Sequence, residues 1–110
     1  MTETYWTKKQ GQELYDKALE LDSQGKTLEA VGVYQKLINA SPKNAQALYN
    51  LGVDYATLGN IEQAIRVWRR AVWLDETFRD ELIKAFSIDD DLAQTVIGGE
   101  DDYLYLGMAA

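Results

Sequence analysis

The side chains that most often carry out nucleophilic, acid–base or metal chemistry are missing from this sequence, which contains no Cys and no His. Thiolate nucleophiles, disulfides and cysteine-ligated metals are therefore excluded, and so are the commonest general base and the commonest metal ligand. An enzyme would need paired carboxylates in a pocket, and the sequence shows no pair placed to face each other. We expect no catalytic residue and no enzyme activity.

One group of carboxylates is spaced as in a calcium-binding loop. Asp89, Asp91 and Glu100 fall at places 1, 3 and 12 of such a loop. The loop also requires an oxygen ligand at place 5 and a glycine at place 6, where Ala93 and Gln94 stand. We therefore expect no bound metal and no cofactor.

Charged side chains are unevenly distributed along the chain. Residues 1–74 carry nine Lys or Arg and eight Asp or Glu, residues 75–110 carry two and ten, and the net charge is −7. The acidic part would repel nucleic-acid phosphates, so we expect no nucleic-acid partner and allow a basic one. The alternative is that these acidic residues only solubilise the chain. Arg66 and Arg70 share a helix face, which is either a solvated surface or a docking site for an acidic segment.

Helical periodicity and turn residues predict the elements that must position any functional side chain. Five helices are expected, over residues 4–23, 27–40, 44–57, 60–74 and 77–86, and a short sixth over 90–97. The predicted N-caps are Thr27, Asn44 and Asn60, and Thr77 is expected to form a capping box with Asp80. Gly25 and Gly59 are expected in the turns, Gly25 in the left-handed conformation.

The sequence repeats itself with a period of 34 residues across the first four predicted helices. When residues 11–44 are aligned with 45–78, apolar positions recur, as in the pairs Leu14 with Leu48, Ala30 with Ala64 and Tyr34 with Trp68. A period of this length, built from paired helices, is typical of a stacked solenoid whose surface recognises other chains.

The repeated residues resemble the tetratricopeptide repeat. The second copy matches the family pattern at Leu48, Leu51, Gly52, Tyr55, Gly59, Ala64, Trp68 and Ala71. It departs at Glu76, where the family has Pro, and the looser first copy departs at Lys17 and Leu37. Gly52 is expected to be small where two helices approach closely, and Trp68 to fill the space that small residues leave.

The resemblance implies an all-α fold, a short right-handed α-solenoid of two helix–turn–helix repeats with a C-terminal capping helix. Residues 1–97 are expected to form this domain, with repeats at about 11–44 and 45–78 and a cap at 79–97. In the cap, the repeat pattern places Leu82, Ala85 and Phe86 on the buried side. Residues 98–110 are expected to form an acidic, aromatic tail.

The resemblance also implies a concave groove for a peptide, lined by the first helix of each repeat. The groove residues expected here are Gln12, Tyr15, Leu19, Gln46, Tyr49, Asn50, Val53, Ile83 and Lys84. The alternative is that Tyr15 and Leu19 pack against the neighbouring repeat. A carboxylate clamp of the kind found in co-chaperone members is not expected, because Asn50 alone matches it fully and too little positive charge remains.

Together these features predict a non-catalytic adaptor that binds a peptide or helix of a partner protein. An assembly or secretion chaperone for one client's apolar segment and a self-associating structural subunit stay open as alternatives. The tail has an acidic lead, 100–102, and apolar anchors, 103–106, and is either disordered or docked in its own or a neighbour's groove, which would make a homo-oligomer. With no apolar run of signal-peptide or membrane-helix length, we expect a cytoplasmic protein with no membrane partner.

Overall fold

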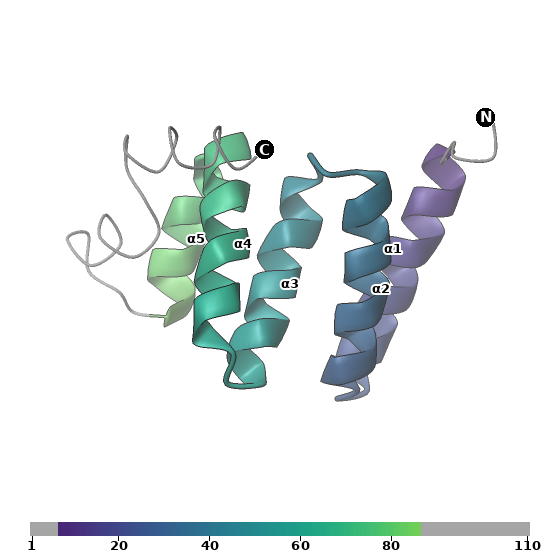
Figure 1. The fold of residues 1–110 in the computed structure, drawn as a ribbon, viewed down its shortest axis with the longest axis horizontal. Coiled ribbons are helices and arrows are strands. Elements are labelled where there is room, and N and C mark those ends of the chain that lie inside the picture. Colours follow the sequence, from purple (N-terminus) through teal and green to yellow (C-terminus); the bar gives the residue numbers. More distant parts are fainter. Residues whose placement is uncertain (1–6, 87–110) are drawn as a thin grey trace.

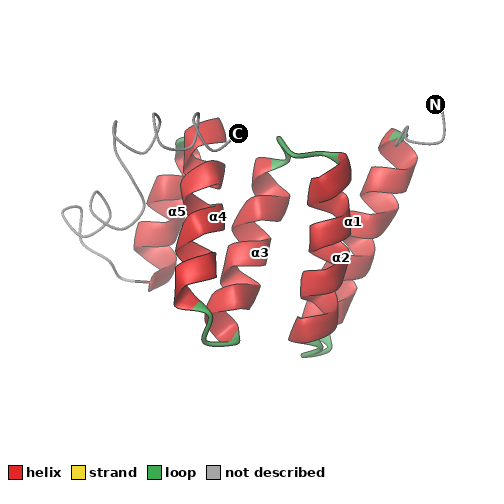
Figure 2. Ribbon diagram, viewed as in Figure 1, coloured by secondary structure: helices red, strands yellow, loops and turns green. Residues whose placement is uncertain are grey.

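The computed structural model describes residues 7–86, which form five α-helices in chain order (Figure 1). The helices are α1 (Lys8–Ser23), α2 (Thr27–Ala40), α3 (Ala45–Thr57), α4 (Ile61–Leu74) and α5 (Thr77–Phe86). Within this range there is no strand, as the colouring by secondary structure shows (Figure 2). Consecutive helices pack against each other, so the expected all-α solenoid of helical hairpins is confirmed.

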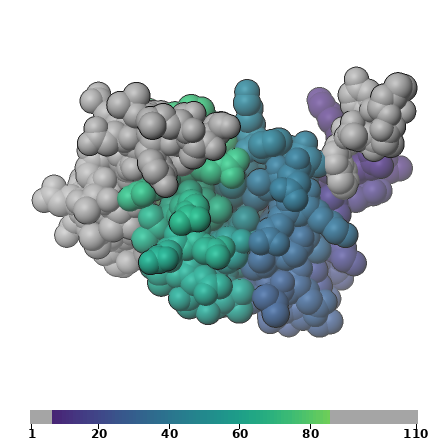
Figure 3. All heavy atoms as spheres, viewed as in Figure 1, coloured from purple at the N-terminus to yellow at the C-terminus, as the bar shows by residue number. Residues whose placement is uncertain are grey.

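The two hairpins, α1–α2 and α3–α4, stand side by side. In Figure 1, α1 and α5 lie behind α2 and α4, so that the first helix of each repeat belongs to one face. In the space-filling view, atoms of the first hairpin (blue) meet those of the second (green) in a continuous surface (Figure 3). The first helices α1, α3 and α5 therefore form the face on which the groove residues were expected.

The core consists largely of the residues that recur with the repeat. Buried apolar residues that the repeat predicts are Ala18, Ala30, Tyr34, Leu48, Leu51, Tyr55, Ala64, Trp68 and Ala71. Gly52 lies so close to the indole ring of Trp68 that a Cβ there would overlap with it. The indole nitrogen of Trp68 also donates a hydrogen bond to the Tyr49 carbonyl oxygen at 3.1 Å. The predicted pairing of a small residue with a large one is therefore confirmed.

In each hairpin, the turn between the two helices contains a glycine in the left-handed conformation. Gly25 has a φ of 75° and Gly59 a φ of 85°, a conformation that costs a residue without a Cβ little. The amide of the next residue then bonds back to the helix, from Lys26 to the Leu21 carbonyl at 2.9 Å and from Asn60 to the Tyr55 carbonyl at 2.8 Å. These are the bonds of a Schellman motif, and they reverse the chain at equivalent places in both repeats.

One predicted helix start and one predicted N-cap are wrong. α1 begins at Lys8 rather than at residue 4, because Thr7 caps it: the Thr7 hydroxyl accepts from the Gln10 amide, and the Gln10 side chain accepts from the Thr7 amide. This is a capping box. In α2 the N-cap is Lys26 rather than Thr27, and no side chain caps the helix, because the Schellman turn already positions the chain.

The caps predicted for α3, α4 and α5 are confirmed to different extents. Asn44 caps α3, since its side-chain oxygen accepts from the Ala47 amide at 3.0 Å. Asn60 stands at the N-cap of α4 but makes no side-chain capping bond. The capping box predicted at Thr77 is wrong, because Thr77 is already the first residue of α5. Its hydroxyl and amide instead donate to Asp75 at 2.7 and 3.0 Å, which lowers the pKa of the Asp75 carboxyl.

The capping helix α5 has one buried side, as predicted, but only some of the residues predicted for that side form it. Leu82 is fully buried and Phe78 is buried with it, whereas Ala85 is exposed. Ala85 was expected inside because its counterpart Leu51 is covered by the partner helix of its repeat, and within the described residues no helix follows α5. The sixth helix predicted at 90–97 and the tail at 98–110 lie outside the described residues.

Candidate functional site

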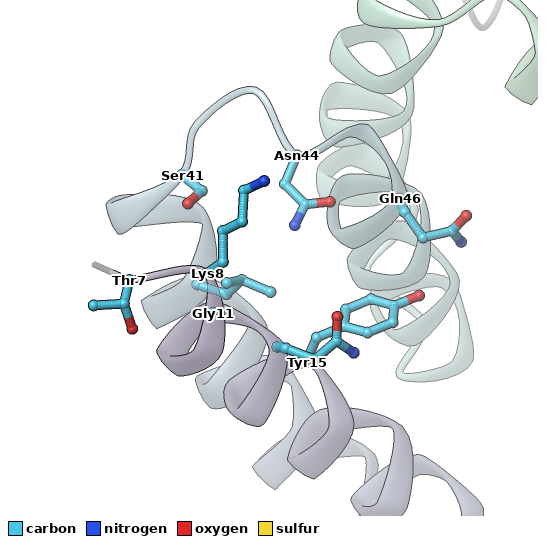
Figure 4. Close-up of a pocket in the computed structure, with 9 residues that line it drawn as sticks. Thr7, Lys8, Gly11, Tyr15, Ser41, Asn44 and Gln46 are labelled. Carbon is cyan, nitrogen blue, oxygen red and sulfur yellow. The ribbon is translucent and has the colours of Figure 1, made fainter. Parts of the chain in front are cut away.

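A pocket of about 470 Å³ opens between the start of α1, the end of α2 and the start of α3 (Figure 4). Its lining consists of Thr7, Lys8, Gly11, Gln12, Tyr15, Leu37, Ser41, Asn44 and Gln46. Most of these residues are polar, and Tyr15 and Leu37 supply the apolar surface. The volume lies within the range of ordinary ligand pockets and would accept a side chain or a short stretch of peptide.

Local folding explains why the pocket lies at this end of the first hairpin. The capping box holds Thr7 and Gln10 together and so makes α1 begin at Lys8. Gly11 faces Leu37 across the hairpin, at a distance that leaves room for a Cβ 3.9 Å from the leucine Cδ1. Leu37 stands where the second repeat has Ala71, and it is buried. A large side chain at the base and a polar rim therefore shape the pocket.

A row of hydrogen bonds runs from the pocket along the contact between α1 and α3. The Gln46 side chain donates to the Asn50 side-chain oxygen at 3.3 Å, and Asn50 donates to the Tyr15 hydroxyl at 2.9 Å. The Tyr15 ring packs edge-on against Tyr34 of α2, with centroids 6.3 Å apart. Burial raises the pKa of Tyr15. Tyr15 therefore lines the pocket and also packs against the neighbouring repeat, which combines the two interpretations of this residue.

Tyr49 takes part in the next contact along the same face. Its ring stacks on Phe78 of α5, with centroids 5.2 Å apart and an angle of 26° between the rings. Burial raises the pKa of the Tyr49 hydroxyl. Val53 and Ile83 are likewise half-buried against the core. The Tyr49 ring therefore joins α3 to α5, and all three side chains present only part of their surface to solvent.

The other groove residues expected from the sequence are exposed. Leu19 is 41% exposed on α1, and Lys84 is exposed on α5. Gln12 and Gln46 are exposed at the pocket, where Gln12 donates to Asp16 at 2.9 Å. The structure thus gathers Gln12, Tyr15 and Gln46 at one pocket, with Asn50 bonded beside them, and places the rest outside its lining. Binding at any of them stays a prediction.

Comparison with protein families gives two matches. A model described as a TPR repeat matches residues 23–59, and one described as a tetratricopeptide repeat matches residues 45–78. Together they span residues 23–78, just over half of the chain, and include all of α2, α3 and α4. The chain belongs to the tetratricopeptide repeat family. No curated protein matches it.

Repeats of the tetratricopeptide family are generally protein–protein interaction modules, and the family is typically non-catalytic. The second match coincides with the second repeat expected from the sequence, residues 45–78. The first match begins within the first repeat and runs to the end of α3 and its turn. The resemblance identified from Leu48, Gly52, Trp68 and Ala71 is therefore confirmed.

Several pocket residues of this tetratricopeptide repeat chain were not foreseen. Lys8 is the one charged residue among those that line the pocket, and its side chain extends between Ser41 and Asn44 (Figure 4). A signal was present in the Thr7–Gln10 spacing, which is that of a capping box and fixes where α1 begins. No comparable signal marks Ser41, because its place at the pocket depends on how α2 and α3 are oriented.

The arginines of α4 have a partly structural role in this repeat. Arg70 donates to the Pro42 carbonyl oxygen at 3.2 Å, which ties the second hairpin to the loop between α2 and α3. Arg66 is exposed on the same helix. Arg70 is therefore not wholly solvated, whereas docking of an acidic segment on this helix stays a prediction.

The expectation that no carboxylates face each other is wrong. Asp54 of α3 is 5% exposed, and its carboxyl group lies next to that of Asp22 of α1. Burial, together with this neighbour, raises the pKa of Asp54 to about 8. The sequence could not show this pair because the two residues lie on different repeats. Neither residue lines the pocket described above.

Two further observations apply to residues 7–86. No group of three or more His, Cys, Asp or Glu side chains in this part of the chain is arranged to hold a metal ion. No helix there is both long enough and apolar enough to cross a lipid bilayer.

Proposed function

We propose that this chain is a non-catalytic adaptor that binds a peptide or a helix of a partner protein across the face formed by α1, α3 and α5. The observation that supports the proposal is the pocket among the start of α1, the end of α2 and the start of α3, because α1 and α3 are the first helices of their repeats. In this proposal residues 1–97 form the binding domain, with Leu19, Tyr49, Val53, Ile83 and Lys84 extending the surface beyond the pocket.

The chemistry of the lining favours an extended segment of polypeptide. The carboxamides of Gln12, Asn44 and Gln46 can each donate and accept hydrogen bonds, as the alternating amide and carbonyl groups of a peptide backbone require. Tyr15 and Leu37 offer apolar contact to one side chain, and Lys8 offers attraction to an acidic one. For so short a surface we expect a Kd of about micromolar, equivalent to about −8 kcal/mol.

The test uses peptides selected from a random phage-displayed library against the wild-type chain. Each peptide is titrated by calorimetry into the wild type and into a double variant, Gln12→Ala with Gln46→Ala. Both glutamines are exposed, so the melting temperature should change little, whereas affinity should fall roughly tenfold. The tyrosines are poorer choices for substitution, because Tyr15 and Tyr49 also hold helices together.

A matched control is Gln63→Ala, which removes an exposed glutamine from α4. It should leave peptide affinity unchanged. Failure to select any peptide, or an equal loss of affinity in Gln63→Ala, would refute binding at this face.

A further inference from the structure

A buried polar cluster joins the two repeats outside the pocket. Asp54 of α3 is almost entirely buried, and it contacts Asp22 in the last turn of α1. Tyr34 of α2, which has no exposed surface, donates its hydroxyl to Asp22 Oδ2 at 3.1 Å. Three helices from both repeats thus meet at two carboxyl groups and one phenol.

The two carboxyl groups leave one oxygen each without a hydrogen-bond donor. Asp22 Oδ1 and Asp54 Oδ2 are buried and have no hydrogen-bond partner among the described residues. An ionised carboxylate can only accept, whereas a protonated one can donate. A single proton held between the two groups would make one of them a donor to the other. Ionisation of both would instead leave two negative charges side by side in a buried place.

Among residues 7–86, no positively charged group contributes to the pKa shift of Asp54. The titratable groups that face Asp54 are Asp22 from α1 and Tyr34 from α2, and α4 contributes none among the described residues. Burial of the Tyr34 hydroxyl, followed by the nearby Asp22 charge, raises the pKa of Tyr34, so the phenol remains a donor and cannot relieve the repulsion further.

We propose that Asp22 and Asp54 form a proton-dependent joint between the two repeats, in which one shared proton holds α1 against α3 and its loss weakens their contact. This proposal is independent of the proposed function, since it concerns how the repeats are held together. It adds a regulatory property, a stability of the repeat stack that depends on pH near neutrality.

The joint lies next to the pocket wall. Asn50 and Asp54 are four residues apart on α3, and so lie on one helix face. Asn50 donates to Tyr15, and Asp54 contacts Asp22, so that α1 and α3 are joined by two polar contacts in a row. Tyr34 takes part in both of these contacts, because its ring packs against Tyr15 and its hydroxyl donates to Asp22. Separation at the carboxyl pair would therefore disturb a residue of the pocket.

The direction of the pH dependence follows from linkage. Burial and Asp22 raise the pKa of Asp54 from 3.8 to about 8, and the pair titrates as a unit. Between these values the folded chain keeps a proton that the unfolded chain releases, so stability falls as pH rises and levels off above about pH 8. Because the chain has no His and no Cys, the side chains that ordinarily titrate in this range are missing.

The experiment is urea unfolding of the full chain at several pH values between about 6 and about 9, followed by circular dichroism. For the wild type, the folding equilibrium constant should fall by up to about tenfold for each pH unit until about pH 8. Asp54→Asn supplies a permanent donor to Asp22, so its stability should be nearly flat with pH and higher than that of the wild type at about pH 9. Glu13→Gln, which alters an exposed carboxylate on α1, should keep the slope of the wild type.

If Asp54→Asn does not fold, a second variant and a second measurement still test the proposal. Asp22→Asn should flatten the slope in the same way. The side-chain carboxyl ¹³C resonance of Asp54 in the wild type should titrate with a midpoint of about 8. A midpoint of about 4, the ordinary range for Asp, or a wild-type slope that persists in both Asn variants would overturn the proposal. If added Ca²⁺ stabilised the chain and stability did not depend on pH, Asp22 Oδ1 and Asp54 Oδ2 would be assigned to a cation site. That result would also overturn the proposal.

Discussion

The size of a residue in one helix of a hairpin is set by the residue that it packs against in the other helix, as Gly52 and Trp68 show. Gly52 is small because the Trp68 indole occupies the space where its side chain would be. Trp68 in turn is held by its hydrogen bond to the Tyr49 carbonyl oxygen. The indole therefore cannot move aside easily, and the size of residue 52 is set by packing rather than by helix propensity.

Two Gly→Ala substitutions should consequently have opposite effects. Gly52→Ala gains about 1 kcal/mol of helix propensity, but overpacking against a fixed ring costs about 1–3 kcal/mol. Because the overlap with Trp68 is severe, the cost of overpacking should exceed the gain in helix propensity. We expect a net destabilisation of about 1–2 kcal/mol. Urea unfolding at constant pH would measure the change.

Gly32→Ala is the matched control at a helical glycine with no atom near the added methyl group. It should stabilise the chain by about 0.5–1 kcal/mol. Equal effects of the two substitutions would contradict the role assigned to Trp68.

At the scale of the element, the ends of the helices are stabilised by different means. α1 and α3 begin with a side-chain cap, from Thr7 and Asn44 respectively. α2 and α4 follow Schellman turns and have no side-chain cap. The glycine turn already orients the first amides of α2 and α4, so a capping side chain there has less to contribute.

Removing the two asparagine N-caps should reveal this difference. Asn44→Ala loses the bond to the Ala47 amide and should cost about 1 kcal/mol. Asn60→Ala removes a side chain that makes no capping bond and should cost less than about 0.5 kcal/mol. Thermal unfolding of both variants gives the comparison, and an equal loss would show that Asn60 caps α4 in solution.

At the scale of the whole molecule, packing of α2 against α3 joins the two repeats, and a few specific contacts between first helices add to it. Tyr15 and Asn50 connect α1 to α3, and Tyr49 and Phe78 connect α3 to α5. In a solenoid, stability is approximately the sum of repeat and interface terms. The contacts between α1 and α3 therefore contribute directly to the stability of the stack, in addition to shaping the pocket.

A double-mutant cycle would measure this interface term. Tyr15→Phe and Asn50→Ala each remove one partner of the hydrogen bond, and the double variant removes both. We expect a coupling energy of about 0.5–1.5 kcal/mol, the usual contribution of one intramolecular hydrogen bond. Equilibrium unfolding of the four proteins supplies the values, and a coupling near zero would mean that the bond adds nothing to repeat docking.

The sequence by itself determined the helices, their turns and the pairing of small with large core residues. Gly25 and Gly59 act on the residues next to them, and the positions of Ala30, Ala64 and Trp68 recur with a period that can be read along the chain. Such features depend on local conformation and on which helix face is buried. They also predicted which helices face the groove, and they placed Ala85 inside although no helix among residues 7–86 covers it.

Only the tertiary structure decided which polar groups meet across the two repeats. The pocket combines Lys8 with Ser41 and Gln46, and the buried pair combines Asp22 with Asp54. These juxtapositions depend on the angle and the register between helices that are distant in sequence. Hydrophobic periodicity sets which face of each helix is buried, but not which residues of two such faces come into contact.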